Sequence, residues 1–232
     1  MKKDKRILII TDSVSMPRLE VKYEDTWIYL LKKKFRNFDI IDRPARGATS
    51  MRLITEGGGG MDLLELYLPG IIILQFGLAE CAPRLFKKNG FEKRFINNFL
   101  PPRLRKYYIK RVRKIRGRKP QFTDVSPEQF KHNIYNFAGR CKAHNIKLAI
   151  IKILRATDIF LKKSPFVQQN IDLYNSIYEQ AALDFDNITL IDPIDIKYDI
   201  NSLCIDELHI TPQGQKLYFK AVEKYMSETN SL

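Results

Sequence analysis

The 232-residue sequence is poor in cysteine: it contains Cys81, Cys141 and Cys204, which are scattered and show no Cys-x-x-Cys spacing. This pattern indicates neither a disulfide framework nor a zinc cluster. Long apolar runs are also missing. No segment approaches the roughly 18 apolar residues of a membrane span, and the run Ile7–Ile10 is too short for a signal peptide. We therefore expect a cytoplasmic protein with free thiols.

Acidic residues are scarce relative to basic ones: 26 Asp and Glu against 40 Lys and Arg give a formal net charge of +14. Such an excess favours an anionic partner, for example a membrane surface, an acidic polymer or a nucleic acid. A hydrophobic content of 44% excludes intrinsic disorder for most of the chain. The length fits one α/β domain over residues 1–232 better than two domains.

Five short apolar runs bounded by polar or turn residues predict strands buried on both faces of a parallel sheet: Ile7–Thr11, Phe38–Asp42, Ile71–Phe76, Leu148–Ile153 and Ile188–Asp192. Helical periodicity lies between and after them, over Tyr23–Phe35, Met61–Tyr67, Pro127–His144, Ile171–Asp184 and Pro212–Ser227. This alternation predicts a layered βαβ domain whose ligand site lies at the carboxyl ends of the strands.

Two segments interrupt the alternation. Gly57–Gly60 lacks the Gly-Lys-Ser/Thr ending of a phosphate-binding loop, so we expect a flexible connector there. The second segment, at about 84–121, is predicted to be a basic helical insertion. Within it, Arg103–Lys119 contains ten basic and no acidic residues in seventeen.

Two polar motifs are candidates for chemistry. Ser13 directly follows the first predicted strand, where a nucleophile would be exposed, although a serine after an aspartate is also a common helix cap. Near the other end, Asp206 precedes His209 by three residues. That spacing lets a carboxylate hold one imidazole nitrogen while the other faces a serine hydroxyl. An isolated Asp-x-x-His is more often a loop carboxylate beside a turn histidine, so this spacing alone does not decide the chemistry.

Four segments, in this order, resemble the blocks of the SGNH/GDSL hydrolase superfamily over nearly the whole chain. They are Ile7 to Ser13, Arg46-Gly47-Ala48, Ile71–Phe76 with the following Gly77-Leu78-Ala79-Glu80, and Asp206-x-x-His209. The resemblance implies a flavodoxin-like three-layer α/β/α sandwich with a five-stranded parallel sheet. It also implies a catalytic triad of Ser13, Asp206 and His209, an oxyanion hole formed by the backbone N–H groups of Ser13 and Gly47, and no metal or organic cofactor.

The third block departs from the family pattern Gly-x-Asn-Asp, because Ala79 and Glu80 stand at its last two positions. Loss of one oxyanion donor typically costs about two to three decades in rate. The stretch resembles a variant, Gly-Ile-Val-Asp-Cys-Ala-Pro-Arg, of SGNH-like proteins from bacterial surface-polysaccharide gene clusters. Gly77, Ala79, Glu80 and Arg84 are therefore candidate substrate or oxyanion contacts. Arg84 either supplies the missing positive charge or forms a salt bridge with Glu80, four residues earlier.

The resemblance implies a serine esterase or acyltransferase acting on an acyl ester, in particular acetyl, of a bacterial surface carbohydrate or its lipid-linked precursor. Ala79 leaves open a weakly catalytic or non-catalytic module that binds a glycan. The basic charge leaves open nucleic-acid binding with a relic triad, but no RNP-like, KH-like or zinc-finger spacing supports that partner.

The basic segment also has an apolar pattern. Leu104, Tyr108, Val112 and Ile115 recur at intervals of four, four and three, which predicts an amphipathic helix. Such a helix either lies on an anionic membrane surface or packs on the domain as a lid with its basic face in water. We expect it beside the entrance of the cleft.

Overall fold

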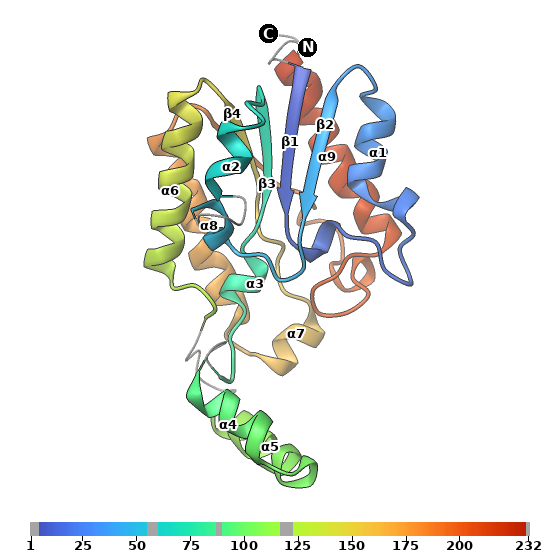
Figure 1. The fold of residues 1–232 in the computed structure, drawn as a ribbon. Coiled ribbons are helices and arrows are strands. Elements are labelled where there is room, and N and C mark those ends of the chain that lie inside the picture. The colour runs from blue at the N-terminus through green and yellow to red at the C-terminus, as the bar shows by residue number, and fades with distance from the viewer. Residues whose placement is uncertain (1–4, 55–59, 87–89, 117–122, 231–232) are drawn as a thin grey trace.

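The computed structural model describes residues 5–54, 60–86, 90–116 and 123–230. At its centre lies a parallel sheet with the strand order β2-β1-β3-β4-β5 (Figure 1). The strands are β1 (Arg6–Thr11), β2 (Asp39–Pro44), β3 (Ile71–Gln75), β4 (Lys147–Ile151) and β5 (Ile188–Ile191). The five predicted strands are confirmed, and each end lies within two residues of its predicted position.

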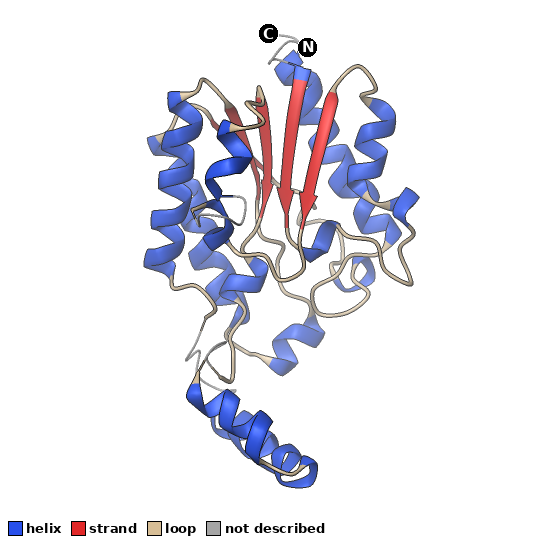
Figure 2. Cartoon of the chain, viewed as in Figure 1, coloured by secondary structure: helices blue, strands red, loops and turns tan. Residues whose placement is uncertain are grey.

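Helices cover both faces of the sheet, which confirms the predicted three-layer α/β/α architecture (Figures 1 and 2). On one face, α1 (Trp27–Lys34) packs against α9 (Pro212–Asn230). On the other face lie α2 (Gly60–Glu65), α6 (Pro127–Ala143) and α8 (Val167–Asp184). Buried side chains recur every three or four residues along α6 and α8, so the apolar face of each helix closes the core against the sheet.

The expectation of full burial holds for the central strands and fails at the edge. All residues of β3, and all but the first of β1, are buried because layers of helices cover both faces. In contrast, every residue of β2 is only half-buried, since β2 is the edge strand. Ion pairs of Asp39 with Arg6, and of Asp42 with Lys32, protect this edge.

Some helix ends differ from those predicted. Tyr23–Asp25 forms a 3-10 turn, and Thr26 Oγ1 then accepts a hydrogen bond from Tyr29 N, so that α1 begins only at Trp27. Further 3-10 turns cover Ser13–Ser15, Ser50–Leu53 and Asn201–Leu203. Outside the basic insertion, the described residues include two short helices that were not predicted, α3 (Leu78–Cys81) and α7 (Asp158–Lys163).

The predicted basic insertion contains two helices, α4 (Phe91–Phe99) and α5 (Pro102–Arg116). Figure 1 shows them in green as a pair that projects beyond the carboxyl ends of the strands. The prediction of one helix over Arg103–Lys119 therefore missed α4, and positions 117–119 lie outside the described residues. The same applies to the predicted glycine connector at positions 57–59, whereas Gly60 begins α2.

Candidate active site

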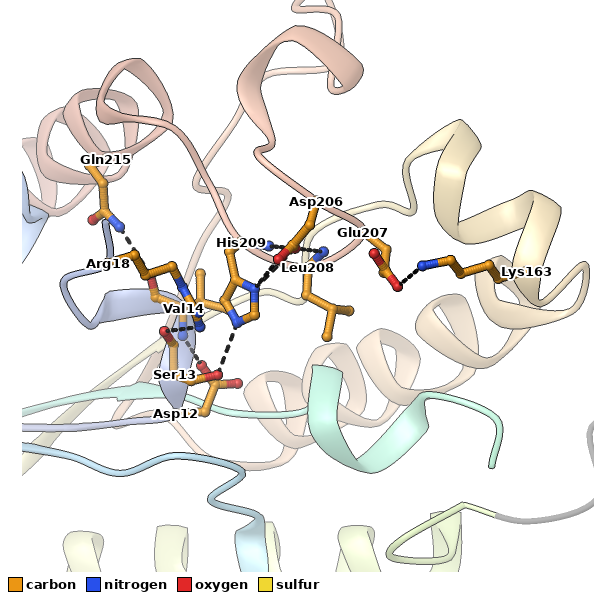
Figure 3. Close-up of polar contacts among 10 residues, drawn as sticks. All are labelled: Asp12, Ser13, Val14, Arg18, Lys163, Asp206, Glu207, Leu208, His209 and Gln215. Atoms are coloured by element: carbon orange, nitrogen blue, oxygen red, sulfur yellow. Dashed lines mark hydrogen bonds and ion pairs between the residues drawn. The ribbon is translucent and has the colours of Figure 1, made fainter. Parts of the chain in front are cut away.

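Ser13 lies in the turn that follows β1, at the carboxyl edge of the sheet (Figure 3). Asp12 N donates to Gln75 O at the end of β3 (3.1 Å), and the chain then turns back over Ser13–Ser15. The Asp12 carboxylate accepts a hydrogen bond from Val14 N (2.9 Å). Asp12 is therefore the cap of this turn, which leaves the hydroxyl of Ser13 available for another contact.

That contact is His209. Its Nε2 lies 3.2 Å from Ser13 Oγ, and its Nδ1 lies 2.8 Å from Asp206 Oδ2 and 3.0 Å from Oδ1 (Figure 3). The contacts predicted from the Asp-x-x-His spacing are therefore present, and they join segments separated by 196 positions. The His209 side chain is only 13% exposed, so its orientation is constrained on most sides.

The Asp206 carboxylate is held by its own turn. Its Oδ1 accepts hydrogen bonds from Leu208 N (2.7 Å) and His209 N (2.8 Å) as well as from the ring. Burial opposes ionisation, but the hydrogen bonds from the His209 ring and these two backbone groups outweigh it and hold the pKa of Asp206 below its usual value. Asp206 is therefore ionised at neutral pH, and its carboxylate orients the imidazole through Nδ1.

A buried amide fixes the distance between the serine turn and the histidine loop. Gln215, in the first turn of α9, donates from Nε2 to Val14 O (3.0 Å) and accepts at Oε1 from Trp27 N (3.0 Å). Its side chain is 1% exposed. One residue thus ties the helix that follows His209 both to the Ser13 turn and to the start of α1.

Gly47, the predicted oxyanion glycine, lies in the turn that follows β2. Ala45 N donates to Thr11 O (3.0 Å), so this turn starts beside the end of β1. Gly47 has a φ of +61°, in the left-handed region that favours glycine. A Cβ at this position would meet no atom within 4 Å, so backbone conformation rather than crowding explains the glycine. Its role as an oxyanion donor stays a prediction.

Glu80 is a structural residue, which corrects the expectation of a substrate contact. The side chain is fully buried, and its two carboxylate oxygens bind Ser50 N (2.8 Å) and Ser50 Oγ (2.7 Å). Asn133 Nδ2 of α6 donates to the same Ser50 Oγ (2.8 Å). Burial raises the pKa of Glu80 to about 7, against the opposing effect of the hydrogen bonds from Ser50. Glu80 therefore links α3 to α6 beneath the surface.

Arg84 does not form the salt bridge with Glu80 that was one of the two contacts expected for it, whereas its contact with an oxyanion stays a prediction. Its Nη2 donates to Asp124 Oδ2 (3.0 Å) and to Ala79 O (2.9 Å), so the partner carboxylate is Asp124 instead of Glu80. The pairing with Asp124 neutralises the charge that was expected to replace the missing oxyanion donor.

Gly77 lies at a position where only glycine fits. Its φ is +120°, in the region that favours glycine, and a Cβ there would lie 2.2 Å from Ile153 Cδ1.

Arg18 is a residue that the sequence interpretation missed. Figure 3 shows its side chain beside Ser13 and His209, and its Nη2 lies 3.4 Å from Ser13 O. Its Nε is buried without a hydrogen-bond partner. The described residues form no direct ion pair with the guanidinium, but its positive charge acts on the neighbouring buried Asp12 and lowers the pKa of that carboxyl against the larger, opposite effect of burial. The only signal in the sequence is an arginine five positions after the candidate nucleophile.

The remaining candidates for chemistry are inert or unclustered. Cys81 and Cys141 are buried, and burial raises the pKa of each thiol well above its ordinary value. Across the described ranges, no three His, Cys, Asp or Glu side chains are grouped as a metal would require. Nor does any described helix have the length and apolarity to cross a membrane.

No protein-family model matches the sequence, and no curated protein matches it. Solved structures do. A catalytic mutant of Axe2, an acetylxylan esterase from Geobacillus stearothermophilus, matches with a TM-score of 0.63 at 9% identity, over 97% of this chain and 94% of that one. The psychrotrophic esterase EstA from Pseudoalteromonas sp. matches with a TM-score of 0.56 at 18% identity, over 97% of this chain and 100% of that one. A GDSL-like lipase from Bacteroides thetaiotaomicron matches with a TM-score of 0.60 at 15% identity, over 99% of this chain and 91% of that one. The chain therefore has the fold of the SGNH/GDSL hydrolases, as the motifs implied.

The buried Glu80 predicts a dependence of stability on pH. Because its pKa is raised in the folded state, its contribution to stability is fully present below the pKa of the unfolded chain and is lost as pH rises through about 7. Glu80→Gln mimics the protonated acid and does not titrate. Between pH 5 and pH 8, the free energy of unfolding of the wild type should fall relative to that of Glu80→Gln by on the order of 1–3 kcal/mol. Urea unfolding at both pH values measures this difference, and parallel pH profiles would contradict it.

Proposed function

We propose that this protein is a serine esterase or acyltransferase of the SGNH type. It acts on an acyl ester, in particular an acetyl ester, of a bacterial surface carbohydrate or its lipid-linked precursor. The observation that carries the proposal is the line of contacts from Ser13 Oγ through His209 to Asp206 at the carboxyl edge of the sheet. A hydroxyl, an imidazole and an ionised carboxylate in this order make a nucleophile, a general base and the group that orients the base.

In the proposed reaction, Ser13 Oγ attacks the acyl carbonyl carbon while His209 Nε2 accepts the hydroxyl proton. Asp206, bound to Nδ1, stabilises the imidazolium that forms. Backbone N–H groups of Ser13 and Gly47 bind the negative charge that develops on the carbonyl oxygen. The tetrahedral intermediate then collapses, and His209 returns the proton to the departing sugar oxygen. This leaves the acyl group on Ser13.

The second half of the reaction removes the acyl group from Ser13. His209 takes a proton from water, or from a hydroxyl of an acceptor, as that oxygen attacks the acyl-enzyme carbonyl. The tetrahedral intermediate then collapses with cleavage of the bond between Ser13 Oγ and the acyl carbon, and His209 returns the proton to Ser13 Oγ. Water gives hydrolysis and an acceptor hydroxyl gives transfer. Both outcomes use the same three side chains, so the proposal covers both reactions.

Two observations support an acetylated carbohydrate as the substrate. One structure with the same fold is described as an acetylxylan esterase. The segment Phe76 to Arg84 resembles the third block of SGNH-like proteins from surface-polysaccharide gene clusters. Ala79 in this block favours the alternative of a glycan-binding module with little or no catalysis, because an oxyanion donor is missing there.

Arg18 favours a substrate with a negative charge near the reacting ester. Among the described residues the guanidinium forms no direct ion pair, although its charge acts on the buried Asp12, and its Nη2 lies 3.4 Å from the backbone oxygen of Ser13. A half-buried arginine of this kind binds a carboxylate or phosphate oxygen through two N–H groups. We infer that the sugar, or the group attached to it, carries such an anion.

The proposal predicts that Ser13→Ala and His209→Ala each lower kcat/KM for p-nitrophenyl acetate by about three decades or more, because each removes a member of the triad. His132→Ala is the matched control, since His132 is exposed on α6 and should leave the rate unchanged. Steady-state kinetics on the purified proteins measures the effect. No hydrolysis by the wild type on any acetyl ester would favour the glycan-binding alternative.

Restoring the family residue should raise activity. Ala79→Asn adds a side-chain N–H donor, and turnover on a generic acetyl ester should rise by a decade or more, as expected for one oxyanion donor. Ala79→Asp serves as the control, because aspartate has a size similar to that of asparagine but no side-chain N–H. Turnover of this variant should not rise. An unchanged rate in a folded Ala79→Asn variant would mean that another group already fills this position.

Charge selectivity tests the role of Arg18. Arg18→Gln should lower kcat/KM for an O-acetylated uronic acid by about tenfold or more, the scale of one charge-assisted contact, and change the rate on the matching neutral sugar little. Arg18→Lys should retain part of the selectivity. An equal loss on the charged and the neutral ester would show that Arg18 only positions Ser13.

A further inference from the structure

The helices α4 and α5 form an antiparallel hairpin that extends away from the three layers (Figures 1 and 2). Tyr108 Oη donates to Glu92 Oε1 (2.8 Å), and Arg105 Nη2 donates to Asn97 O (3.2 Å). Ile96 of α4 and Val112 of α5 are buried, whereas most other side chains of the pair are exposed. The hairpin projects outward and does not cover the sheet, which argues against the lid that the sequence left open.

The exposed surface of α4 carries a row of aromatic side chains. Phe91, Phe95 and Phe99 follow one another at intervals of four, and their rings stack with centroid distances of 6.2 and 5.5 Å. They are 82%, 45% and 72% exposed. We call these three residues the phenylalanine ridge. Contiguous exposed apolar groups of this kind are unusual on a monomeric soluble surface and mark a contact site.

Apolar side chains of α5 extend the same surface. Leu104 and Ile115 are also exposed. The buried residues Ile96 and Val112 define the direction in which the two helices meet. Successive residues of a helix are rotated by about 100° around its axis. On α4 this rotation places the phenylalanine ridge on one side of Ile96. On α5 it places Leu104 and Ile115 on one side of Val112, rotated in the same sense about their own helix axis. Because the helices are antiparallel, the two sides coincide on one face of the hairpin.

The positive charge of the hairpin indicates that its partner is anionic. Residues 90–116 contain ten basic residues and one acidic residue, in a chain whose total formal charge is +14. The single acid, Glu92, is bound to Tyr108. Two such hairpins repel each other, which disfavours a second copy of the chain on this face. An anionic lipid surface matches both properties, because it offers an apolar layer directly beneath its negative head groups.

We propose that the α4–α5 hairpin docks on an anionic bilayer, with the phenylalanine ridge, Leu104 and Ile115 in the interfacial layer and the basic side chains of α5 on the lipid phosphates. The hairpin projects from the edge of the sheet at which Ser13 lies (Figure 1). Docking would thus turn that edge towards the lipid. The inference does not depend on catalysis, because binding is measured without any substrate.

Vesicle cosedimentation of the full chain tests the electrostatic part. Wild type should bind vesicles that contain phosphatidylglycerol and bind vesicles of phosphatidylcholine alone far less. The triple variant Arg111→Gln, Arg113→Gln, Lys114→Gln should lose about two decades in partition coefficient at low salt. The matched control is Lys33→Gln, Arg36→Gln, Lys224→Gln. It removes equal charge from exposed positions around α1 and in α9, outside the hairpin, and should lose much less.

Tryptophan fluorescence tests insertion of the ridge. The native Trp27 is fully buried, so its emission provides a constant background. Phe95→Trp should show a blue shift with anionic vesicles and quenching by brominated lipid. Leu183→Trp, at an exposed position of α8, should show neither. The triple variant Phe91→Ser, Phe95→Ser, Phe99→Ser should lose the binding that persists at high salt.

Four results would overturn the inference. They are equal binding to neutral and anionic vesicles, binding that survives both hairpin variants, a dimer in sedimentation that the triple serine variant abolishes, and duplex DNA binding through Arg111, Arg113 and Lys114 without vesicle binding. The dimer would identify the ridge as a self-association surface, and the DNA result would identify a nucleic-acid partner. Thermal unfolding confirms that each variant is folded.

Discussion

The buried amide of Gln215 is the constraint on which the site geometry depends. It joins the start of α9 to Val14 O in the serine turn and to Trp27 N at the start of α1. Since His209 lies in the loop just before α9, this bond sets how close the imidazole comes to Ser13. Asp206 then orients the ring from the same loop. The contacts among Ser13, His209 and Asp206 thus depend on packing of the last helix against the first as well as on the three side chains themselves.

The altered third block becomes understandable once its contacts are known. Glu80 is used for internal support through Ser50 and Asn133, and Arg84 is paired with Asp124. Both side chains thus have internal partners at the block in which the family pattern would place an asparagine at Ala79. Arg18, three residues after the Ser13–Ser15 turn, lies with Nη2 3.4 Å from Ser13 O, and its charge acts on the buried Asp12. Electrostatics at this site therefore depend on a different loop from the one that the family motif emphasises.

The sequence predicted the features that depend on local pattern. Continuous apolar runs such as Ile71–Phe76 located the strands, and the order of Ser13, Asp206 and His209 located the contacts of the site. It did not predict partners that are distant along the chain. The pairing of Glu80 with Ser50 and the role of Gln215 have no local signature. The apolar stripe of α5 was recognised, but the phenylalanine ridge of α4 was missed because charged and amide residues interrupt it.

The central claim, that His209 activates Ser13 as a nucleophile, is tested most directly by labelling with a fluorophosphonate. An activated serine displaces fluoride from the probe and forms a stable phosphonyl ester, whereas an ordinary hydroxyl does not react. Intact mass and peptide mapping of the wild type should show one adduct, on Ser13, and its formation should slow greatly in His209→Ala. A folded wild type that stays unlabelled, or that is labelled on another serine, would contradict the claim.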